Sequence, residues 1–397
     1  MKRVMLILLS AVMLLTGCAG NNQSQTSGAL TPDKVFGGAT PDIDGYDPPA
    51  SMMRITSQQL VNNIRVGWNL GSALDCCLTG TEADSGIDPD DVNETLWGNP
   101  PASQKLFEAL VDNGVNAVRL PITWRDHMDE DGTVSEGWFN RVKQVVDYAY
   151  SCGMYVIITV YHDGAEGAWL RLAADNYDET IARYKYLWQQ IAEKFRSYNE
   201  RLLFESMNEV DFTGVSPDES FSLVNRINQE FVNTIRSSGG NNPWRHLLIA
   251  GYNADITPTC DSRFIMPEDS VGRCILSVHY YIPAIFCKET VQEKWGSNSD
   301  QIWMETMISQ LKTNFTDKGI PAMITEYGAR GGDIPSRVFF CEKLTKLCRT
   351  AGIAAFLWDD GSEFDRTEFT WSTPGLIAAI KRAAGDEEYT PKKADTE

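Results

Sequence analysis

The sequence has few of the features that mark cofactor, metal or nucleic-acid proteins. Its nine cysteines form no Cys-x-x-Cys or mixed Cys/His pattern, so no structural zinc site is expected. Residues 66–71, in the first strand-like run, lack the glycine spacing of a dinucleotide-binding loop. The formal charge of −19 repels nucleic acid and anionic lipid surfaces. We therefore expect no cofactor, no metal and no nucleic-acid partner.

Long apolar runs are also missing, apart from one near the start of the chain. Lys2 and Arg3 precede an apolar segment over residues 4–15, which is too short to span a bilayer comfortably and is typical of a secretory signal. The Leu-Thr-Gly-Cys sequence that ends at Cys18 resembles a bacterial lipobox. The resemblance implies cleavage before Cys18, a lipid on its sulfur, and an extracytoplasmic lipoprotein that contacts the membrane only through that lipid. The alternative is an ordinary signal peptide with a chance cysteine.

The composition then divides the chain into four parts. Residues 1–18 are the signal segment, and residues 19–50 are rich in small and polar residues, as in a flexible tether. Residues 51–385 are long for one domain but normal for an α/β barrel with loop insertions, so we expect a single catalytic domain there. Residues 386–397 form a charged tail. We expect a monomer.

Eight mostly apolar, strand-like runs punctuate the long central part. They are nearly continuous in apolar residues, as parallel strands covered on both faces are. Helical periodicity separates most of them, for example over 181–195, 224–235 and 304–315, and is weakest over 254–274. Eight alternations of strand and helix predict a closed (β/α)8 TIM barrel of the α/β class. The runs are 65–71, 116–122, 155–162, 202–209, 246–253, 275–281, 321–328 and 353–359.

Two of these runs end in a glutamate. LLFESMNEV delivers Glu209 and PAMITEYGA delivers Glu326. Barrel enzymes place their chemistry at the C-terminal ends of the strands, and glycoside hydrolysis needs two facing carboxyl groups. The fourth and seventh strands lie roughly opposite each other, so we expect carboxyl groups about 5–5.5 Å apart, the spacing of a retaining enzyme. Glu326 would then be the nucleophile, and Glu209 the proton donor with a raised pKa.

Further polar and aromatic residues fall at the same predicted rim. Arg119 and a tyrosine hydroxyl of the sixth strand could hold Glu326 as a carboxylate, although Arg119 could instead form a structural ion pair in the barrel mouth. Indole rings stack well on sugars, and Trp358 closes the eighth strand, whereas Trp97, Trp124 and Trp169 are loop candidates that could equally belong to the core. The remaining rim residues are Asn69, Tyr161, His162, Asn208, His279 and Tyr281.

The order of these motifs resembles glycoside hydrolase family five, over about residues 55–380. The resemblance implies that Arg119 supports the nucleophile Glu326, that Asn208 binds a sugar 2-hydroxyl, and that Glu209 is the acid/base. It also implies that His279 lies near Glu209, that Tyr281 hydrogen-bonds Glu326, and that the Trp358 ring forms the floor of the sugar site. In many members the peptide bond after this tryptophan is cis. The blocks are VGWNLG at 66–71, TLWGNP at 95–100, VRLP at 118–121, MNE at 207–209, VHYY at 278–281, TEYG at 325–328 and FLWD at 356–359.

Two positions depart from the family pattern. Tyr161 stands where the family has the first histidine of a pair, and only His162 remains, so sugar placement is expected to differ. Val210 follows Glu209 where proline is common, so this loop is expected to be less fixed. Neither change removes a catalytic carboxyl group.

The leading hypothesis is a retaining, endo-acting β-1,4-glucanase of the subfamily-four type that cleaves cellulose-like, mixed-linkage or xyloglucan chains. The alternatives are a β-mannanase on the same scaffold and a lipid-anchored, non-catalytic glycan-binding protein. The presence of two paired carboxyl groups favours an enzyme, because a binding protein has no need of them.

Overall fold

The computed structural model describes residue 52 and residues 54–78 and 93–385. The predictions for residues 1–18, including Cys18, for the tether at 19–50 and for the tail at 386–397 lie outside the described residues. Within the described ranges, no helix combines the length and the apolar character needed to cross a bilayer.

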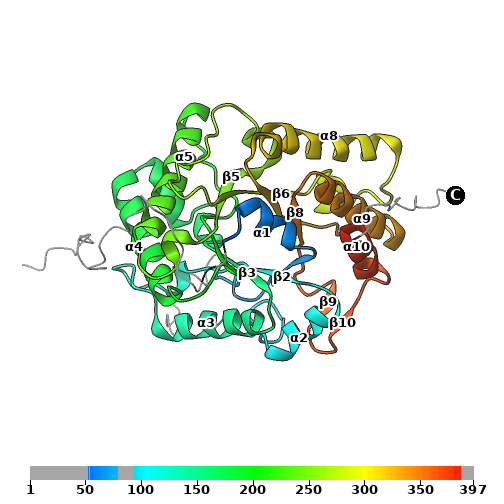
Figure 1. Cartoon of the computed structure of the whole chain (residues 1–397), viewed down its shortest axis with the longest axis horizontal. Helices are drawn as coiled ribbons and strands as arrows, with labels where there is room; N and C mark the ends of the chain where they lie inside the picture. Colours follow the sequence, from blue (N-terminus) through cyan, green and yellow to red (C-terminus); the bar gives the residue numbers. More distant parts are fainter. Residues whose placement is uncertain (1–51, 53, 79–92, 386–397) are drawn as a thin grey trace, which may run out of the picture.

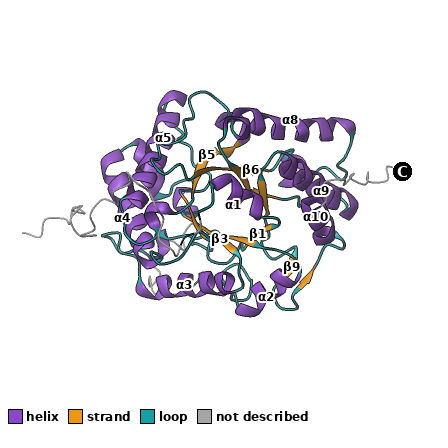
Figure 2. Cartoon of the chain, viewed as in Figure 1, coloured by secondary structure: helices purple, strands orange, loops and turns teal. Residues whose placement is uncertain are grey.

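Eight parallel strands form a closed barrel in sequence order, each hydrogen-bonded to the next and β8 to β1. Figure 2 shows these strands at the centre of the molecule with helices around them. The prediction of a (β/α)8 barrel is therefore confirmed. The strands are β1 Gly67–Asn69, β2 Ala117–Leu120, β3 Tyr155–Thr159, β4 Leu202–Glu205, β5 Leu247–Asp255, β6 Cys274–Tyr280, β7 Ala322–Tyr327 and β8 Ala354–Leu357.

The helices begin and end where local chemistry predicts. Ser, Asn or Asp side chains accept a backbone N–H at the start of most long helices, for example Ser216 from Glu219. Gly153, after α3, adopts a left-handed φ of 83°, which glycine tolerates without a steric penalty. Only one helical turn follows β5, in agreement with the weak periodicity there. The helices are α1 Ser57–Asn63, α2 Gln104–Asp112, α3 Glu136–Ser151, α4 Tyr177–Lys194, α5 Pro217–Arg236, α6 Ile256–Thr259, α7 Ala284–Cys287, α8 Asn298–Asn314, α9 Ile334–Thr350 and α10 Leu376–Gly385.

Shorter elements complete the loops. A two-stranded antiparallel hairpin, β9 Phe364–Asp365 and β10 Thr370–Trp371, follows β8. The short 3-10 helices are η3 Arg125–His127, η4 His162–Gly164, η5 Trp169–Ala174, η6 Asn242–Trp244 and η7 Thr316–Lys318.

The end of the barrel where the strands begin, its lower end, is closed by α1. This helix lies across the middle of the barrel in Figure 1. Leu60 and Val61 of this helix and Ile64, which directly follows it, are fully buried. They form one apolar cluster with residues from seven strands. Because this plug fills the N-terminal end, the opposite end is left to carry polar side chains. The strand residues of the cluster are Ala117, Ile157, Leu203, Leu248, Ile275, Met323, Ala354 and Phe356.

Above the apolar cluster, a layer of polar side chains points into the barrel. Each of these residues lies two positions further along its strand, because alternate residues of a strand point the same way. Arg119 follows Ala117, Glu205 follows Leu203, and Ser277 follows Ile275 in this layer, and all three are buried. The register shifts between β6 and β7, so that Val278 pairs with Ile324 but His279 pairs with Glu326. A bulge of this kind re-aims side chains. It adds one residue to β7 and lets both Thr325 and Glu326 contact polar groups inside the barrel.

Several predicted strands are longer than the observed ones. β4 ends at Glu205 rather than at residue 209, and β3 ends at Thr159 rather than at residue 162. Asn208 and Glu209 therefore lie in the turn that follows β4, and His162 begins the 3-10 helix η4 after β3. The apolar runs continue past the last ladder hydrogen bond because these turns also pack into the core, as Met207 and Val210 do.

All eight cysteines within the described residues are free thiols. Five of them are buried, in agreement with the interpretation of most as small apolar core residues. These five are Cys76, Cys77, Cys287, Cys341 and Cys348.

Candidate active site

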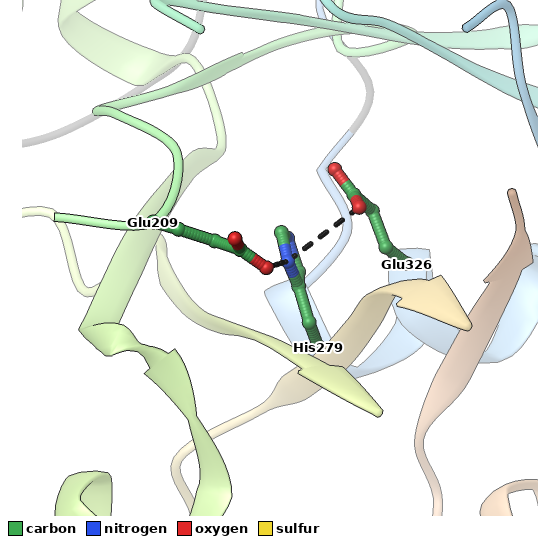
Figure 3. Close-up of side chains that lie close together, drawn as sticks. All are labelled: Glu209, His279 and Glu326. Carbon is green, nitrogen blue, oxygen red and sulfur yellow. Dashed lines mark hydrogen bonds and ion pairs between the residues drawn. The ribbon is translucent and has the colours of Figure 1, made fainter. Parts of the chain in front are cut away.

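The structure brings Glu209 and Glu326 together at the C-terminal end of the barrel. Glu209 lies in the turn after β4 and Glu326 lies in β7, and their side chains point toward one another with His279 between them (Figure 3). Nδ1 of His279 lies 2.8 Å from Oε1 of Glu209 and 3.6 Å from Oε2 of Glu326. One side-chain atom from each of the three residues lies within 4.8 Å of the others. This spacing is close to the about 5 Å of a retaining pair of carboxyl groups and shorter than that of an inverting pair.

Arg119 lies beneath Glu326 and is fully buried. Its NH1 group donates to Oε1 of Glu326 at 2.6 Å and its Nε donates to Oε2 of Glu205 at 2.5 Å. Its NH2 group donates to Oδ1 of Asn208 at 2.9 Å. Burial alone would lower the pKa of Arg119, but the charges of Glu205 and Glu326 raise it, so the guanidinium stays charged. Both interpretations of Arg119 hold at once, because it forms a buried ion pair and contacts the candidate nucleophile.

Two further predicted residues contact this network. The hydroxyl of Tyr281 donates to Oε2 of Glu326 at 3.0 Å, as the sixth-strand tyrosine was expected to do. Asn69 accepts from NH1 of Arg119 at 3.2 Å and donates to the carbonyl of Thr325 at 2.9 Å. Asn69 is completely buried, so it supports the site from below and does not reach the cavity.

A cavity of about 300 Å³ opens above the two carboxyl groups. Its lining includes Tyr161, Tyr281 and Trp358 together with both glutamates. Two cations that sequence reasoning did not single out, Lys288 and Arg330, also line it, and Arg330 pairs with Asp360. No strand ends at either cation, so the inspection of strand ends could not find them.

The structure places the aromatic candidates in different surroundings. Trp358 lines the cavity, and its ring stacks nearly parallel to that of Tyr161, with centroids 5.9 Å apart. His162 contacts Tyr161 edge-on, and Trp97 in turn packs edge-on against His162 with 43% of its surface exposed. Trp124, by contrast, is fully buried and donates to the carbonyl of Thr159, so its candidacy as a sugar platform is wrong.

The remaining loop candidate is Trp169, which is half-buried. Its indole Nε1 donates to the buried carboxyl group of Asp163 at 2.8 Å. It does not line the cavity described above.

The pKa of Glu209 differs in direction from the sequence prediction. Burial raises it, but the hydrogen bond from His279 and the positive charges of His279, Lys288 and Arg119 lower it to about 2. The prediction considered only repulsion by Glu326 and omitted these cations. Glu209 is therefore ionised in the empty site, where 38% of its side chain is exposed to solvent.

The pKa values of the third-strand residues also depart from their usual range. Burial lowers the pKa of His162 to about 4, with a smaller contribution from Arg125, so its imidazole is neutral. Burial and the Glu326 charge raise the pKa of Tyr161 well above 10, so the phenol keeps its proton. Both residues offer hydrogen bonds to a neutral ligand without adding charge.

The turn after Glu209 is well held despite Val210. Val210 is completely buried, and its carbonyl accepts the backbone N–H of Asn253 at 2.9 Å. Arg171 donates to the carboxyl group and the carbonyl of Asp211. These contacts replace the restraint of a proline, so the expectation of a less fixed loop is not supported.

The peptide bond after Trp358 is another correction. It is not cis; among the described residues the cis bond is Ile282–Pro283. A non-proline bond favours trans strongly, and the Trp358 ring lines the cavity with the trans bond in place.

Within the described residues, the carboxyl and imidazole groups that lie close enough to hold a metal ion are those of Glu209, His279 and Glu326. Two of them, Glu209 and Glu326, are the carboxyl groups that the sequence assigns to catalysis, and His279 is the residue that the resemblance places near Glu209. The expectation of a metal-free, cofactor-free reaction remains a prediction.

A closed parallel barrel with two facing carboxyl groups at the ends of its strands is an arrangement that retaining glycoside hydrolases use. A family model described as cellulase (glycosyl hydrolase family 5) matches residues 80–363. The chain therefore belongs to glycosyl hydrolase family 5.

Relatives in this family show extended similarity. Endoglucanase B of Clostridium cellulovorans is 33% identical over 354 residues, which cover 83% of this chain and 76% of that protein. Cellulase/esterase CelE of Acetivibrio thermocellus is 31% identical over 98% of this chain, which spans only about half (48%) of CelE. The xyloglucan-specific endo-beta-1,4-glucanase BoGH5A of Bacteroides ovatus is 32% identical over 87% of this chain and 74% of that protein. The structure of a GH5-4 broad specificity endoglucanase from an uncultured bovine rumen ciliate matches with a TM-score of 0.77 and 33% identity, covering 83% of this chain and 98% of that chain.

Proposed function

We propose that this protein is a retaining, endo-acting β-1,4-glucanase that cleaves cellulose-like, mixed-linkage or xyloglucan chains. The observation that carries the proposal is the short spacing, within 4.8 Å, between carboxyl oxygens of Glu209 and Glu326 over an open cavity. This spacing leaves no room for a water molecule beside a sugar ring, as inversion requires, and suits a covalent intermediate. Relatives named as endoglucanases support the choice of glucan.

In the first step, an oxygen of Glu326 bonds to the anomeric carbon while the glycosidic C–O bond breaks. Glu209 delivers a proton to the leaving oxygen. In the second step, Glu209 takes a proton from water, and that water displaces Glu326 from the sugar. Arg119 and Tyr281 hold Glu326 as a carboxylate through the bonds described above.

The proton donor must first gain its proton. In the empty site, Glu209 is ionised because His279 donates to it. A bound glucan would exclude water from the exposed part of the Glu209 side chain. Exclusion of water strengthens the same burial effect that already raises the pKa of Glu209. Substrate binding thereby favours the protonated form that the first step needs.

The remaining site residues place the sugar. We assign Asn208, which is oriented by Arg119, to a sugar hydroxyl, and the Trp358 ring to stacking under the sugar next to the cleaved bond. Tyr161 occupies the position of the family's usual histidine and contributes a phenol beside Trp358, with His162 and the exposed Trp97 behind it.

The proposal includes the location of the enzyme. The lipobox-like sequence ending at Cys18 supports an extracytoplasmic lipoprotein at the cell surface or in the periplasm. Mass spectrometry of the membrane fraction would detect an acylated N-terminal Cys18, and a soluble mature chain without lipid would refute the anchor.

The test of the activity is reducing-sugar release from carboxymethyl cellulose, mixed-linkage glucan, xyloglucan and mannan. We expect release from the glucans and a loss of about 10⁴-fold or more in Glu326→Ala, because the variant lacks the covalent nucleophile. Glu209→Ala should retain most activity on aryl glycosides with good leaving groups, which need little protonation.

A matched control is Glu342→Ala, because Glu342 is also buried, pairs with Arg382, and does not line the cavity. This variant should stay active. Release from mannan alone would identify a β-mannanase, and binding to glucan without release by the wild type would identify a non-catalytic binding protein.

A further inference from the structure

A second buried glutamate lies directly beneath the candidate nucleophile. Glu205, the last residue of β4, is 1% exposed and does not line the cavity. Its Oε2 accepts from Nε of Arg119 at 2.5 Å, and its Oε1 accepts from the hydroxyl of Ser277 at 2.5 Å. The Ser277 hydroxyl is also 2.6 Å from the Thr325 hydroxyl, one residue before Glu326. None of the catalytic steps above uses Glu205.

The charges of this cluster are unequal. One guanidinium, that of Arg119, contacts the carboxylates of both Glu205 and Glu326. All three groups are almost completely shielded from water. Solvent therefore screens their interactions only weakly, and the positive charge is shared between two acceptors.

A shared charge has a consequence for a nucleophile. A carboxylate that is the only anionic partner of a buried guanidinium is strongly stabilised as an anion. Such a carboxylate attacks carbon slowly and is a good leaving group. A second carboxylate on the same guanidinium weakens this stabilisation. The arrangement also fixes the plane of the Arg119 guanidinium, because its Nε and NH1 groups donate to different carboxylates.

We propose that Glu205 is a positioning residue that acts through Arg119: it orients the guanidinium and takes up part of its charge, so that Glu326 remains nucleophilic enough to attack. This inference rests on the proposed function, in which Glu326 is the nucleophile. It assigns the buried glutamate of the LLFES sequence a task in the rate of the first step rather than in folding alone.

The variant that tests this inference is Glu205→Gln. Glutamine has the same shape, and its amide oxygen can accept from Nε of Arg119. Its amide NH2 can donate to the Ser277 hydroxyl, which then donates to Thr325; the existing contact permits either direction. The variant thus removes one negative charge and keeps every hydrogen bond of the cluster.

The assay uses a dinitrophenyl β-cellobioside, for which loss of the sugar from the enzyme limits kcat. We expect kcat/KM to fall about tenfold because attack is slower, while kcat changes less than about threefold and KM therefore rises. The pH at which activity is half-lost on the acid side should move down by about one unit, because Glu326 then experiences the undivided charge of Arg119.

Asp269→Asn is the matched control. Asp269 forms a similarly shielded ion pair with Arg236, remote from the cavity lining. This change should leave both the acid limb of the pH profile and KM as in the wild type. Ser277→Ala removes the second hydrogen bond of Glu205 and keeps its charge, so it should not move the acid limb.

The inference is overturned if Glu205→Gln folds, cleaves the substrate, and shows an unmoved acid limb with kcat and kcat/KM lowered in parallel. If the variant does not fold, Glu205→Asp provides the second test: it keeps the charge and should keep the acid limb while losing rate. An inactive wild type would instead refute the proposed function.

Discussion

Replacing Arg119 by methionine tests how far the buried charges depend on one another. The methionine side chain fills part of the space and leaves Glu205 and Glu326 without the cation that now contacts both of them. Removing one partner of a buried ion pair costs about 3–5 kcal/mol. Two carboxylates lose their partner here, so we expect a loss at or above the upper end, about 5 kcal/mol at pH 7.

The pH dependence of this loss is the more specific result. Carboxyl groups that have no cation beside them take up protons as the pH falls, and their neutral forms cost less to bury. The loss in Arg119→Met should therefore shrink from pH 7 to pH 4.5. A triple variant that also carries Glu205→Gln and Glu326→Gln should recover most of the stability at pH 7, because it buries no unpaired charge.

The assay is urea unfolding followed by circular dichroism and tryptophan fluorescence, at both pH values. Arg236→Met is the control, because it leaves a single carboxylate, Asp269, without its partner. A loss in Arg119→Met of less than about 1 kcal/mol at pH 7, or one that is equal at pH 7 and 4.5, would show that the buried cluster is not held by charge as described.

Two other predictions concern single residues. His246 is completely buried at the lower end of the barrel, where its Nδ1 lies 2.8 Å from the Ser57 hydroxyl of α1. Burial, together with nearby arginines, holds the pKa of His246 well below 6.5. Below about pH 6.5, His246 therefore takes up a proton in the unfolded chain but not in the folded chain. The free energy of unfolding falls as the pH drops through that value. In His246→Gln, the decrease in the urea midpoint between pH 7 and pH 5 should be smaller than in the wild type, and an equal decrease would contradict this account. Tyr161→Phe should lower kcat/KM on glucan about tenfold, mainly through KM, because it removes one hydroxyl donor and keeps the stack on Trp358; unchanged kinetics would show that Tyr161 contributes only its ring.

The strand ends were the most informative part of the sequence. Glu209 and Glu326 could be singled out because a polar residue after a nearly continuous apolar run has no place in a core, and parallel strands end on one rim. Glu205 was missed because it lies inside the LLFES run, where inspection of strand ends does not reach. Strand alternation offered a signal, since Glu205 points the same way as Leu203, which contacts the α1 plug.

Other residues could not be placed because their surroundings come from distant segments. Trp97 and Trp124 both lie outside the barrel strands and near polar residues, yet 43% of Trp97 is exposed and Trp124 is fully buried. The lowered pKa of Glu209 depends on His279 and Lys288, which are about 70 and 80 residues further along the chain. Sequence reasoning weighed only the like charge of Glu326 and therefore predicted the wrong direction.

The order of apolar runs and helical periods was enough to determine the barrel, because a strand buried on both faces and a helix buried on one carry different patterns of hydrophobicity. The same order determined which two carboxyl groups would reach the rim. Only the closed tertiary structure decided their spacing, the extra residue in β7 beside His279, and the sharing of Arg119 between Glu205 and Glu326. These features arise where strands from distant parts of the chain meet, and both distance and charge at such a point depend on all the partners together.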